Sequence, residues 1–178
     1  VMTTRLPLEG LRVIDVSSFI AAPAAAVVLG DYGADVIKVE PPGEGDPHRG
    51  NINLTSFPKS DVNYPWHLDA RNKRSIALDL KRPEARAALD LLIDKADVLI
   101  TNYPFPVRGR LRLSYEEVSA RNPRLIYASF SGYGEEGADK DQPGYDSNAY
   151  FARSGIIDGI HYEGAPPGFA LPAQGDRP

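Results

Sequence analysis

The sequence contains no cysteine, which excludes a disulfide framework and thiol catalysis and is compatible with a cytoplasmic location. It also lacks an apolar run near the ~20 residues that a membrane-spanning helix needs, and it has no basic-then-apolar leader. The net charge of −4 argues against a general affinity for nucleic acid. We therefore expect a cytoplasmic protein with neither a membrane nor a nucleic-acid partner, in which local bases meet any anionic ligand.

Several common site motifs are missing as well. The loop Ser17–Ala22 follows the first predicted strand but has no glycine, so it lacks the fingerprint of dinucleotide binding, and no P-loop is present. Ser129–Gly132 lacks the preceding glycine of the G-x-S-x-G nucleophile elbow. The three histidines, His48, His67 and His161, have no metal-ligand spacing, so we expect no metal site and interpret them as surface or packing residues.

The chain is organised around Leu11–Glu40, which predicts a strand, an open loop, an apolar helix and a second strand. Pro23 suits a first helical turn, and Gly33 suits the position that ends a helix. The intervening helix has no polar face, so we expect it to be buried. Ligands of such parallel units bind beyond the carboxyl ends of the strands, which places a candidate site at Ser17–Ala22.

A second unit of the same type follows. The pattern predicts a strand at Ser75–Lys81, a helix from Pro83 with one apolar stripe, and a strand at Val98–Ile100. Later elements are a helix with a capping box, a strand and a further helix, over Ser114–Arg121, Leu125–Phe130 and Asp146–Arg153. The fold class is α/β, a Rossmann-like parallel sheet with flanking helices that is incomplete because later elements are missing.

Three stretches have both a functional and a structural interpretation. Pro41–Arg74 predicts an irregular excursion, and its aromatic residues favour a functional loop. Arg71–Arg74 and Arg108–Arg112 are basic clusters that could meet phosphates, although a solvated surface is the favoured interpretation. Asp176 follows an uncharged run, Pro166–Gly175, so partial desolvation could make it a better nucleophile, although a solvated loop aspartate is the default.

Segments from nearly the whole chain, taken in order, resemble the N-terminal part of the class III CoA transferases, a family that includes formyl-CoA and carnitine-CoA transferases and the 2-methylacyl-CoA racemases. The matching segments are Pro7–Val13, Leu29–Gly43, Asn72–Lys81, Asn122–Ala128, Pro143–Asp146 and Gly175–Asp176.

The resemblance implies a transferase that moves coenzyme A from an acyl-CoA to a small carboxylic acid, with Asp176 as the catalytic residue. In the family this aspartate attacks the thioester to form an acyl anhydride, and the released thiolate returns to give an aspartyl-CoA thioester. The incoming acid then attacks, and CoA leaves on the new acid. Coenzyme A is thus a substrate, and no metal is implied.

The resemblance also implies a set of CoA-binding positions at strand ends. Arg110 would meet the adenine or a phosphate, and Tyr145 and Asp146 would lie near the pantetheine and thioester. The remaining positions are Ile20, Ala21, Leu78, Asp79, Leu80, Lys81, Asn102, Tyr103 and Pro104.

Departures from the family pattern bear on the choice of activity. The racemase branch resembles this segment but has a histidine where this chain has Tyr145, and a phenol with a pKa near ~10 is a poor base at pH 7, which favours a transferase over a racemase. An arginine expected after Asn102 is missing, and Arg108 is its candidate substitute.

Family members are roughly twice this length or more and form an interlocked homodimer. We therefore interpret residues 1–178 as the N-terminal part of the large CoA-binding domain, without the small domain and the C-terminal return. A non-catalytic CoA-binding fragment stays an alternative to the active transferase and to the racemase.

Overall fold

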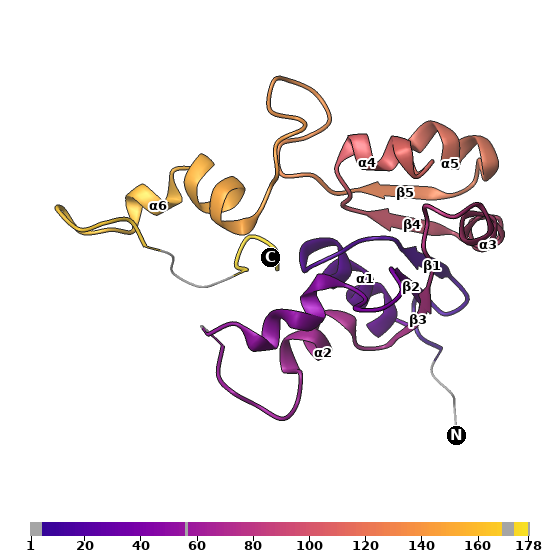
Figure 1. Cartoon of the computed structure of the whole chain (residues 1–178), viewed down its shortest axis with the longest axis horizontal. Helices are drawn as coiled ribbons and strands as arrows, with labels where there is room; N and C mark the ends of the chain where they lie inside the picture. Colours follow the sequence, from indigo (N-terminus) through magenta and orange to yellow (C-terminus); the bar gives the residue numbers. More distant parts are fainter. Residues whose placement is uncertain (1–4, 56, 169–172, 178) are drawn as a thin grey trace.

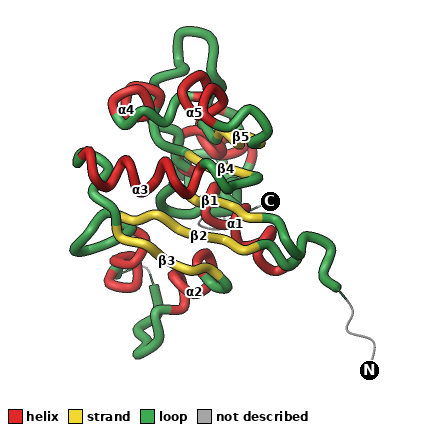
Figure 2. Tube along the Cα trace, turned by 90° about the vertical axis from the view of Figure 1, so that its right-hand side faces the viewer, coloured by secondary structure: helices red, strands yellow, loops and turns green. Residues whose placement is uncertain are grey.

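Five short strands form one sheet: β1 (Arg12–Asp15), β2 (Asp35–Glu40), β3 (Lys73–Ala77), β4 (Val98–Thr101) and β5 (Ile126–Ser129). All neighbours pair in parallel, in the spatial order β3-β2-β1-β4-β5, which Figure 2 shows from bottom to top. The computed structural model describes residues 5–55, 57–168 and 173–177. The predicted α/β class with a parallel sheet is confirmed.

The helical segments connect the strands and extend beyond them (Figure 1). They are α1 (Ala21–Asp31), the 3-10 helix η1 (Pro47–Asn53), α2 (Tyr64–Ala70), α3 (Pro83–Ile93), α4 (Phe105–Arg110), α5 (Tyr115–Arg121), the π-helical segment η2 (Asp146–Arg153) and α6 (Ile156–Gly159). In the part of the chain that the structure describes, no helix has the length and apolar character required to cross a membrane.

The core lies on both faces of the sheet because successive strand residues point to opposite sides. On one face Val13, Val36 and Ile100 pack with Ala22 and Ala26 of α1. On the other face the strand residues pack against α3 and α5, in a cluster of Ile14, Val16, Ile37, Val39, Leu89, Ile93, Leu99 and Val118. Strands covered on both faces explain the nearly continuous apolar runs of β1, β2 and β4.

The order of the strands creates a crevice between β1 and β4. From β1 the chain proceeds to β2 and β3 on one side of the sheet, whereas from β4 it proceeds to β5 on the other. The loops that leave β1 and β4 therefore diverge, although Val13 of β1 pairs with Val98 of β4. Ligands of open parallel sheets bind at such a point, beyond the carboxyl ends of the strands.

Two local predictions hold in detail. The helix α5 begins with the predicted capping box, in which the Ser114 hydroxyl accepts from the Glu117 N–H and the Glu117 side chain accepts from the Ser114 N–H. Pro23 lies in the first turn of α1, and Gly33 has a φ of +105° directly after that helix, so residues with special backbone geometry stand where the sequence places them.

Other local predictions are wrong. Pro41–Arg74 contains η1 and α2 rather than irregular chain, because Asp46 and Asn63 cap two short helices with their side chains. The strand predicted at Ser75–Lys81 is β3, which begins at Lys73 and ends at Ala77.

The predictions for two helices are also wrong. The helix α4 was not expected at all. The apolar helix α1 is buried on one face only, since 52% of Val28 is exposed on the other.

Glu40, the last residue of β2, is a buried carboxylate with several donors. It is 4% exposed, receives two hydrogen bonds of 2.8 Å from Arg49, and also accepts from the Ser75 hydroxyl and the Asp46 N–H. Burial alone would raise its pKa, but the hydrogen bonds from Arg49, Ser75 and Asp46 outweigh it and hold the pKa at about 2.

Glu40→Gln tests this network. The folded pKa lies below the unfolded value of 4.5, so the carboxylate stabilises the fold above pH ~5 and loses that contribution as the pH falls toward 2. We expect the variant to be less stable than wild type by about 1–3 kcal/mol at pH 7, and the difference to shrink as the pH falls from about 5 to about 2. Urea unfolding between pH 3 and 7 measures both. The exposed Glu44→Gln is the matched control. An equal deficit at pH 3 and pH 7 would contradict the assignment.

Candidate active site

A cavity of about 200 Å³ lies beyond the carboxyl ends of β1, β2 and β4. Its lining comes from the loop after β1, the end of β2 with the loop that follows, and the residue after Asn102: Ser17, Ser18, Val39, Glu40, Pro41, Asp46, Pro47 and Tyr103. A larger hollow of about 330 Å³ lies at the amino ends of β2 and β3, lined in part by the ion-paired Asp35 and Arg74. Only the first lies where parallel sheets bind ligands.

Buried charges form the floor of the site beneath this cavity. The Lys38 side chain of β2 is 2% exposed, its Nζ lies 2.8 Å from Asp46 Oδ2 and 3.7 Å from Asp15 Oδ2, and it donates to the Ser17 carbonyl. Lys73 Nζ donates to Asp15 Oδ2 at 2.9 Å. Burial lowers the pKa of Lys73, and the Asp15 charge partly offsets that effect. Two buried lysines and two buried aspartates thus compensate one another.

Side chains from two other segments, Asn102 and Asp46, form hydrogen bonds with the backbone of the loop after β1. The amide of Asn102 accepts from the Ser18 N–H and donates to the Ser18 carbonyl, at 2.9 and 2.7 Å, so it bridges the crevice between β1 and β4. The Phe19 N–H donates to Asp46 Oδ1, and Phe19 has a φ of +63°, which is rare for an aromatic residue. Ile20 and Ala21 follow at the start of α1, both partly buried.

The predicted residues after β4 and β3 lie at the same edge of the sheet. Tyr103 lines the cavity, and burial, with smaller contributions from Asp46 and Asp15, raises its pKa to about 12, so the phenol stays neutral. Pro104 is the exposed residue before α4. Leu78 and Leu80 pack against the core, while the Asp79 carboxylate accepts from the Lys81 N–H in a turn.

The two arginines of α4 differ in their exposure and in their hydrogen bonds. Arg110 is exposed in the last turn of this helix. Arg108 is 3% exposed and donates to the Tyr103 carbonyl, the Ser129 hydroxyl and the Phe130 carbonyl. The interpretation of Arg108 as a phosphate ligand is therefore wrong, since its guanidinium is occupied in joining β4 to β5.

The cluster Arg71–Arg74 is likewise paired within the chain. Arg71 pairs with Asp31, Arg74 pairs with Asp35, and Lys73 is buried on Asp15. The interpretation of this cluster as a solvated surface holds for Arg71 and Arg74, whose side chains are 46% and 65% exposed, and is wrong for Lys73, whose side chain is 2% exposed. In the described parts of the chain no group of three His, Asp or Glu side chains is arranged to hold a metal ion.

Asp176 lies in a turn at residues 173–176, close to the C-terminal end of the chain. In Figure 1 this C-terminal segment lies between η2 and α1. The Asp146 carboxylate fixes this turn by accepting from the Ala173 N–H at 2.9 Å and the Gly175 N–H at 2.7 Å. A side chain on Gly175 would overlap the Tyr150 ring, so only glycine allows this approach.

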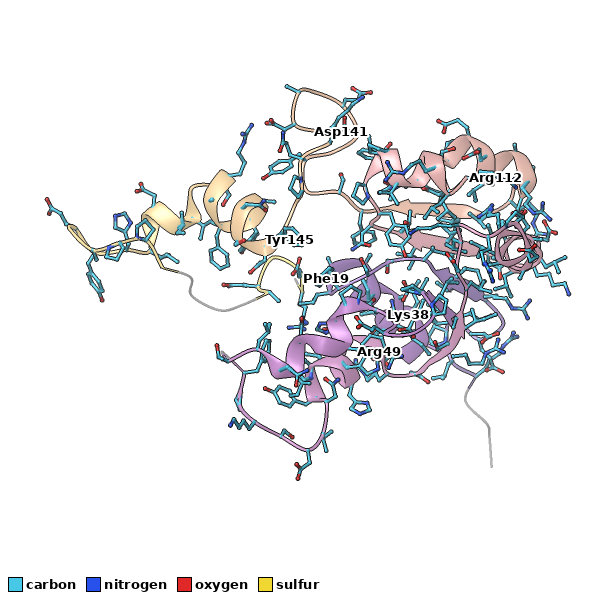
Figure 3. The ribbon with its side chains drawn as sticks, in the orientation of Figure 1. Phe19, Lys38, Arg49, Arg112, Asp141 and Tyr145 are labelled. Carbon is cyan, nitrogen blue, oxygen red and sulfur yellow. The ribbon has the colours of Figure 1, made fainter. Side chains whose placement is uncertain are left out.

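Tyr145, directly before Asp146, packs edge-on against Phe19, with ring centroids 6.1 Å apart (Figure 3). The contacts of Asp146 and Tyr145 therefore connect the turn of Asp176 to the mouth of the first loop.

Burial raises the pKa of Asp176, as its uncharged neighbours in the sequence predicted. The next cause was not predicted. The Asp146 carboxylate also raises this pKa, Arg177 lowers it, Asp69 raises it and His48 lowers it. Asp176 thus lies among charged or titratable groups from η1, α2 and η2 rather than in an apolar pocket.

Sequence reasoning missed Asp69, Arg177 and His48, which lie together beside this turn. Asp69 stands before a basic cluster, Arg177 follows the candidate nucleophile, and His48 belongs to a proline- and glycine-rich segment. No spacing in the sequence connects these three residues.

Asp146→Asn tests whether the Asp146 carboxylate raises the pKa of Asp176. The amide loses one of two backbone hydrogen bonds and the negative charge, so we expect the pKa of Asp176 to fall toward its ordinary value. Carbon-detected NMR titration of side-chain carboxylates measures it directly. Asp139→Asn, which removes an exposed charge paired with Arg153 of η2, is the matched control. An unchanged Asp176 titration in Asp146→Asn would refute the electrostatic coupling.

Comparison with known proteins places this geometry in a family. Residues 8–177 match CoA-transferase family III. The chain is 38% identical over 171 residues to (R)-2-hydroxy-4-methylpentanoate CoA-transferase of Clostridioides difficile, covering 96% of this chain and 43% of that protein. It is 39% identical over 170 residues to cinnamoyl-CoA:phenyllactate CoA-transferase of Clostridium sporogenes, covering 95% of this chain and 41% of that protein.

A solved structure agrees with the sequence relatives. A CAIB/BAIF family protein from Brucella suis superposes with a TM-score of 0.85 at 34% identity, over 97% of this chain and 46% of that one. The chain spans less than half the length of these relatives. On the match over residues 8–177 and these identities, the chain belongs to CoA-transferase family III.

Proposed function

We propose that the protein of which these residues form a part transfers coenzyme A from an acyl-CoA to a small carboxylic acid, with Asp176 as the acyl acceptor. The observation that supports this most directly is the state of Asp176, a partly buried carboxylate in a turn anchored beside the first loop. Family membership supports the same reaction class, since the two relatives compared above are named as CoA-transferases.

The chemistry follows from the nucleophile. The ionised Asp176 oxygen attacks the thioester carbonyl, and the C–S bond breaks to give an acyl anhydride and CoA thiolate. The thiolate then attacks the aspartyl carbonyl of the anhydride and releases the donor acid, which leaves CoA on Asp176 as a thioester. The acceptor carboxylate repeats these two steps in reverse and departs as its CoA thioester. Covalent catalysis divides one difficult exchange into easier steps, and each step conserves the thioester or anhydride bond energy.

Partial desolvation suits this role. A partly desolvated carboxylate is a stronger nucleophile than a fully solvated one, and burial raises the pKa of Asp176. Arg177 opposes the effects of burial and of Asp146 on this pKa, which favours the ionised form needed for attack.

CoA would lie across the carboxyl edge of the sheet. In this proposal the cavity beside Tyr103 takes part of the nucleotide, the exposed Arg110 meets a phosphate or the adenine, and Leu78–Lys81 borders the same edge. Ile20, Ala21 and the Tyr145–Asp146 pair then line the path of the pantetheine toward Asp176. The acids Glu40 and Asp46 at the cavity are paired with Arg49 and Lys38, so they do not repel a phosphate as free carboxylates would.

Two expectations about the whole protein stay predictions. Residues 1–178 are the N-terminal part of a larger CoA-binding domain, which is in keeping with their span of less than half of the relatives. The working form is a homodimer, which light scattering of the purified protein would test.

Trapping the intermediate tests the proposal. We expect incubation with acyl-CoA and hydroxylamine to convert Asp176 to a hydroxamate, read by peptide mass spectrometry. Asp176→Asn should lower acyl transfer by at least about 10³-fold because the covalent intermediates cannot form. Asp158→Asn, at an exposed acid of α6, should behave as wild type. Retained transfer in Asp176→Asn would refute the role of Asp176, whereas tight CoA binding without any labelling or turnover in wild type would support the non-catalytic CoA-binding fragment instead.

A further inference from the structure

The residue that follows the proposed nucleophile is fixed by a two-point ion pair to a distant helix. Arg177 Nε donates to Asp69 Oδ1 at 3.0 Å, and Arg177 Nη2 donates to Asp69 Oδ2 at 2.5 Å. Asp69 lies on α2, 108 residues earlier, and its side chain is only 2% exposed. A bidentate pair of this kind fixes orientation as well as distance, because the guanidinium is planar and rigid.

Asp69 is in turn held by its surroundings. His48 Nε2 lies 2.8 Å from Asp69 Oδ2, and the His48 ring is buried. The side-chain amide of Asn51 lies 2.7 Å from His48 Nδ1, so with the amide donating there, Nε2 carries the hydrogen that points at Asp69. The backbone carbonyl of Asp69 accepts from Lys73 Nζ, which also binds Asp15 at the end of β1.

We propose that Asp69 is a positioning residue for CoA transfer, which acts through Arg177 to hold the turn of Asp176 against α2; this inference rests on the function proposed above. The turn then has an anchor on each side of the nucleophile. Asp146 holds residues 173 and 175 on the amino side, and Asp69 holds residue 177 on the carboxyl side.

The location of the anchors explains why the effect should reach catalysis. With only the Asp146 anchor, the backbone after Gly175 could rotate and carry the Asp176 carboxylate out of line with the thioester. Misplacement of a reacting group by about 1 Å can cost on the order of 10²-fold in rate. Among the residues that the structure describes, the charged or titratable groups that act on the pKa of Asp176 include Asp146 of η2, Asp69 of α2, His48 of η1 and Arg177 beside it. Releasing Arg177 therefore also removes its positive charge from the nucleophile.

Single-turnover acylation of Asp176 tests the proposal. We expect Asp69→Asn and Arg177→Gln each to slow acylation by about tenfold or more, with little change in the acyl-CoA concentration that gives half the maximal rate. Because both remove one connection, the double variant should be no slower than the worse single variant. Multiplying effects in the double variant, or wild-type rates in both single variants, would overturn the proposal.

The pH profile separates positioning from charge. Arg177→Gln should move the acid limb of the acylation rate to higher pH, because the positive charge that favours ionised Asp176 is lost. Arg177→Lys keeps the charge but cannot form the two-point contact, so we expect it to restore the pH profile and to leave the rate low. A full rate recovery in Arg177→Lys would show that charge alone matters and would overturn the positioning role.

Hydrogen exchange separates this inference from the proposed function. The amides of residues 173–177 should exchange faster in Asp69→Asn and Arg177→Gln than in wild type, whether or not acyl transfer occurs. Asp31→Asn, which breaks the exposed pair with Arg71, is the matched control and should change neither exchange nor rate. If wild type is not acylated, the proposed function fails while exchange still tests the anchor; unchanged exchange in both variants would refute the anchor itself.

Discussion

The arrangement of the site depends on the compensation of Lys38 by Asp15 and Asp46. An ammonium group that is 2% exposed within the inner strand β2 is costly unless it is paired, and these carboxylates come from the end of β1 and from the N-cap of η1. The same Asp15 also receives Lys73 from β3. One connected set of charges therefore ties together three neighbouring strands and the segment after β2. Figure 3 shows Lys38 in the interior of the domain, below Phe19.

This set of buried charges also fixes the loop after β1, the segment that contains Asp46 and the end of α2. Asp46 pairs with Lys38 and also accepts from the backbone of Phe19, so the first loop is fixed from below while Asn102 fixes it from β4. Lys73 holds the end of α2, and α2 carries Asp69 toward Arg177. In the arrangement proposed above, Asp69 of α2 and Asp146 of η2 hold the turn that carries Asp176, so side chains from distant parts of the chain meet at one edge of the sheet.

Much of the architecture was predictable from local patterns. The two strand–helix–strand units, the capping box at Ser114 and the positive φ at Gly33 each follow from residues close together in the sequence. The edge of the sheet at which the candidate residues gather was also predictable, because parallel strands direct all their carboxyl ends to one side. The resemblance to class III CoA transferases made Asp176 the candidate nucleophile, whereas its uncharged neighbours alone gave only a weak signal.

The errors have two causes, which are distant partners for Arg108 and weak local signals for Pro41–Arg74. Arg108 looked available to a phosphate, but its guanidinium is occupied by groups at the ends of β4 and β5. The segment Pro41–Arg74 looked irregular because its helices are short and depend on single caps, with Asp46 and Asn63 as the acceptors.

The sequence by itself determined the parallel α/β class, the edge of the sheet that holds the candidate site and the residue types available there, because strand alternation, helix periodicity and capping are local properties. Only the tertiary structure decided which charges are free and which are used internally. It joined Asp69 to Arg177 and Asp146 to the turn of Asp176, because ion pairs in a folded chain depend on distances in space that no local pattern encodes.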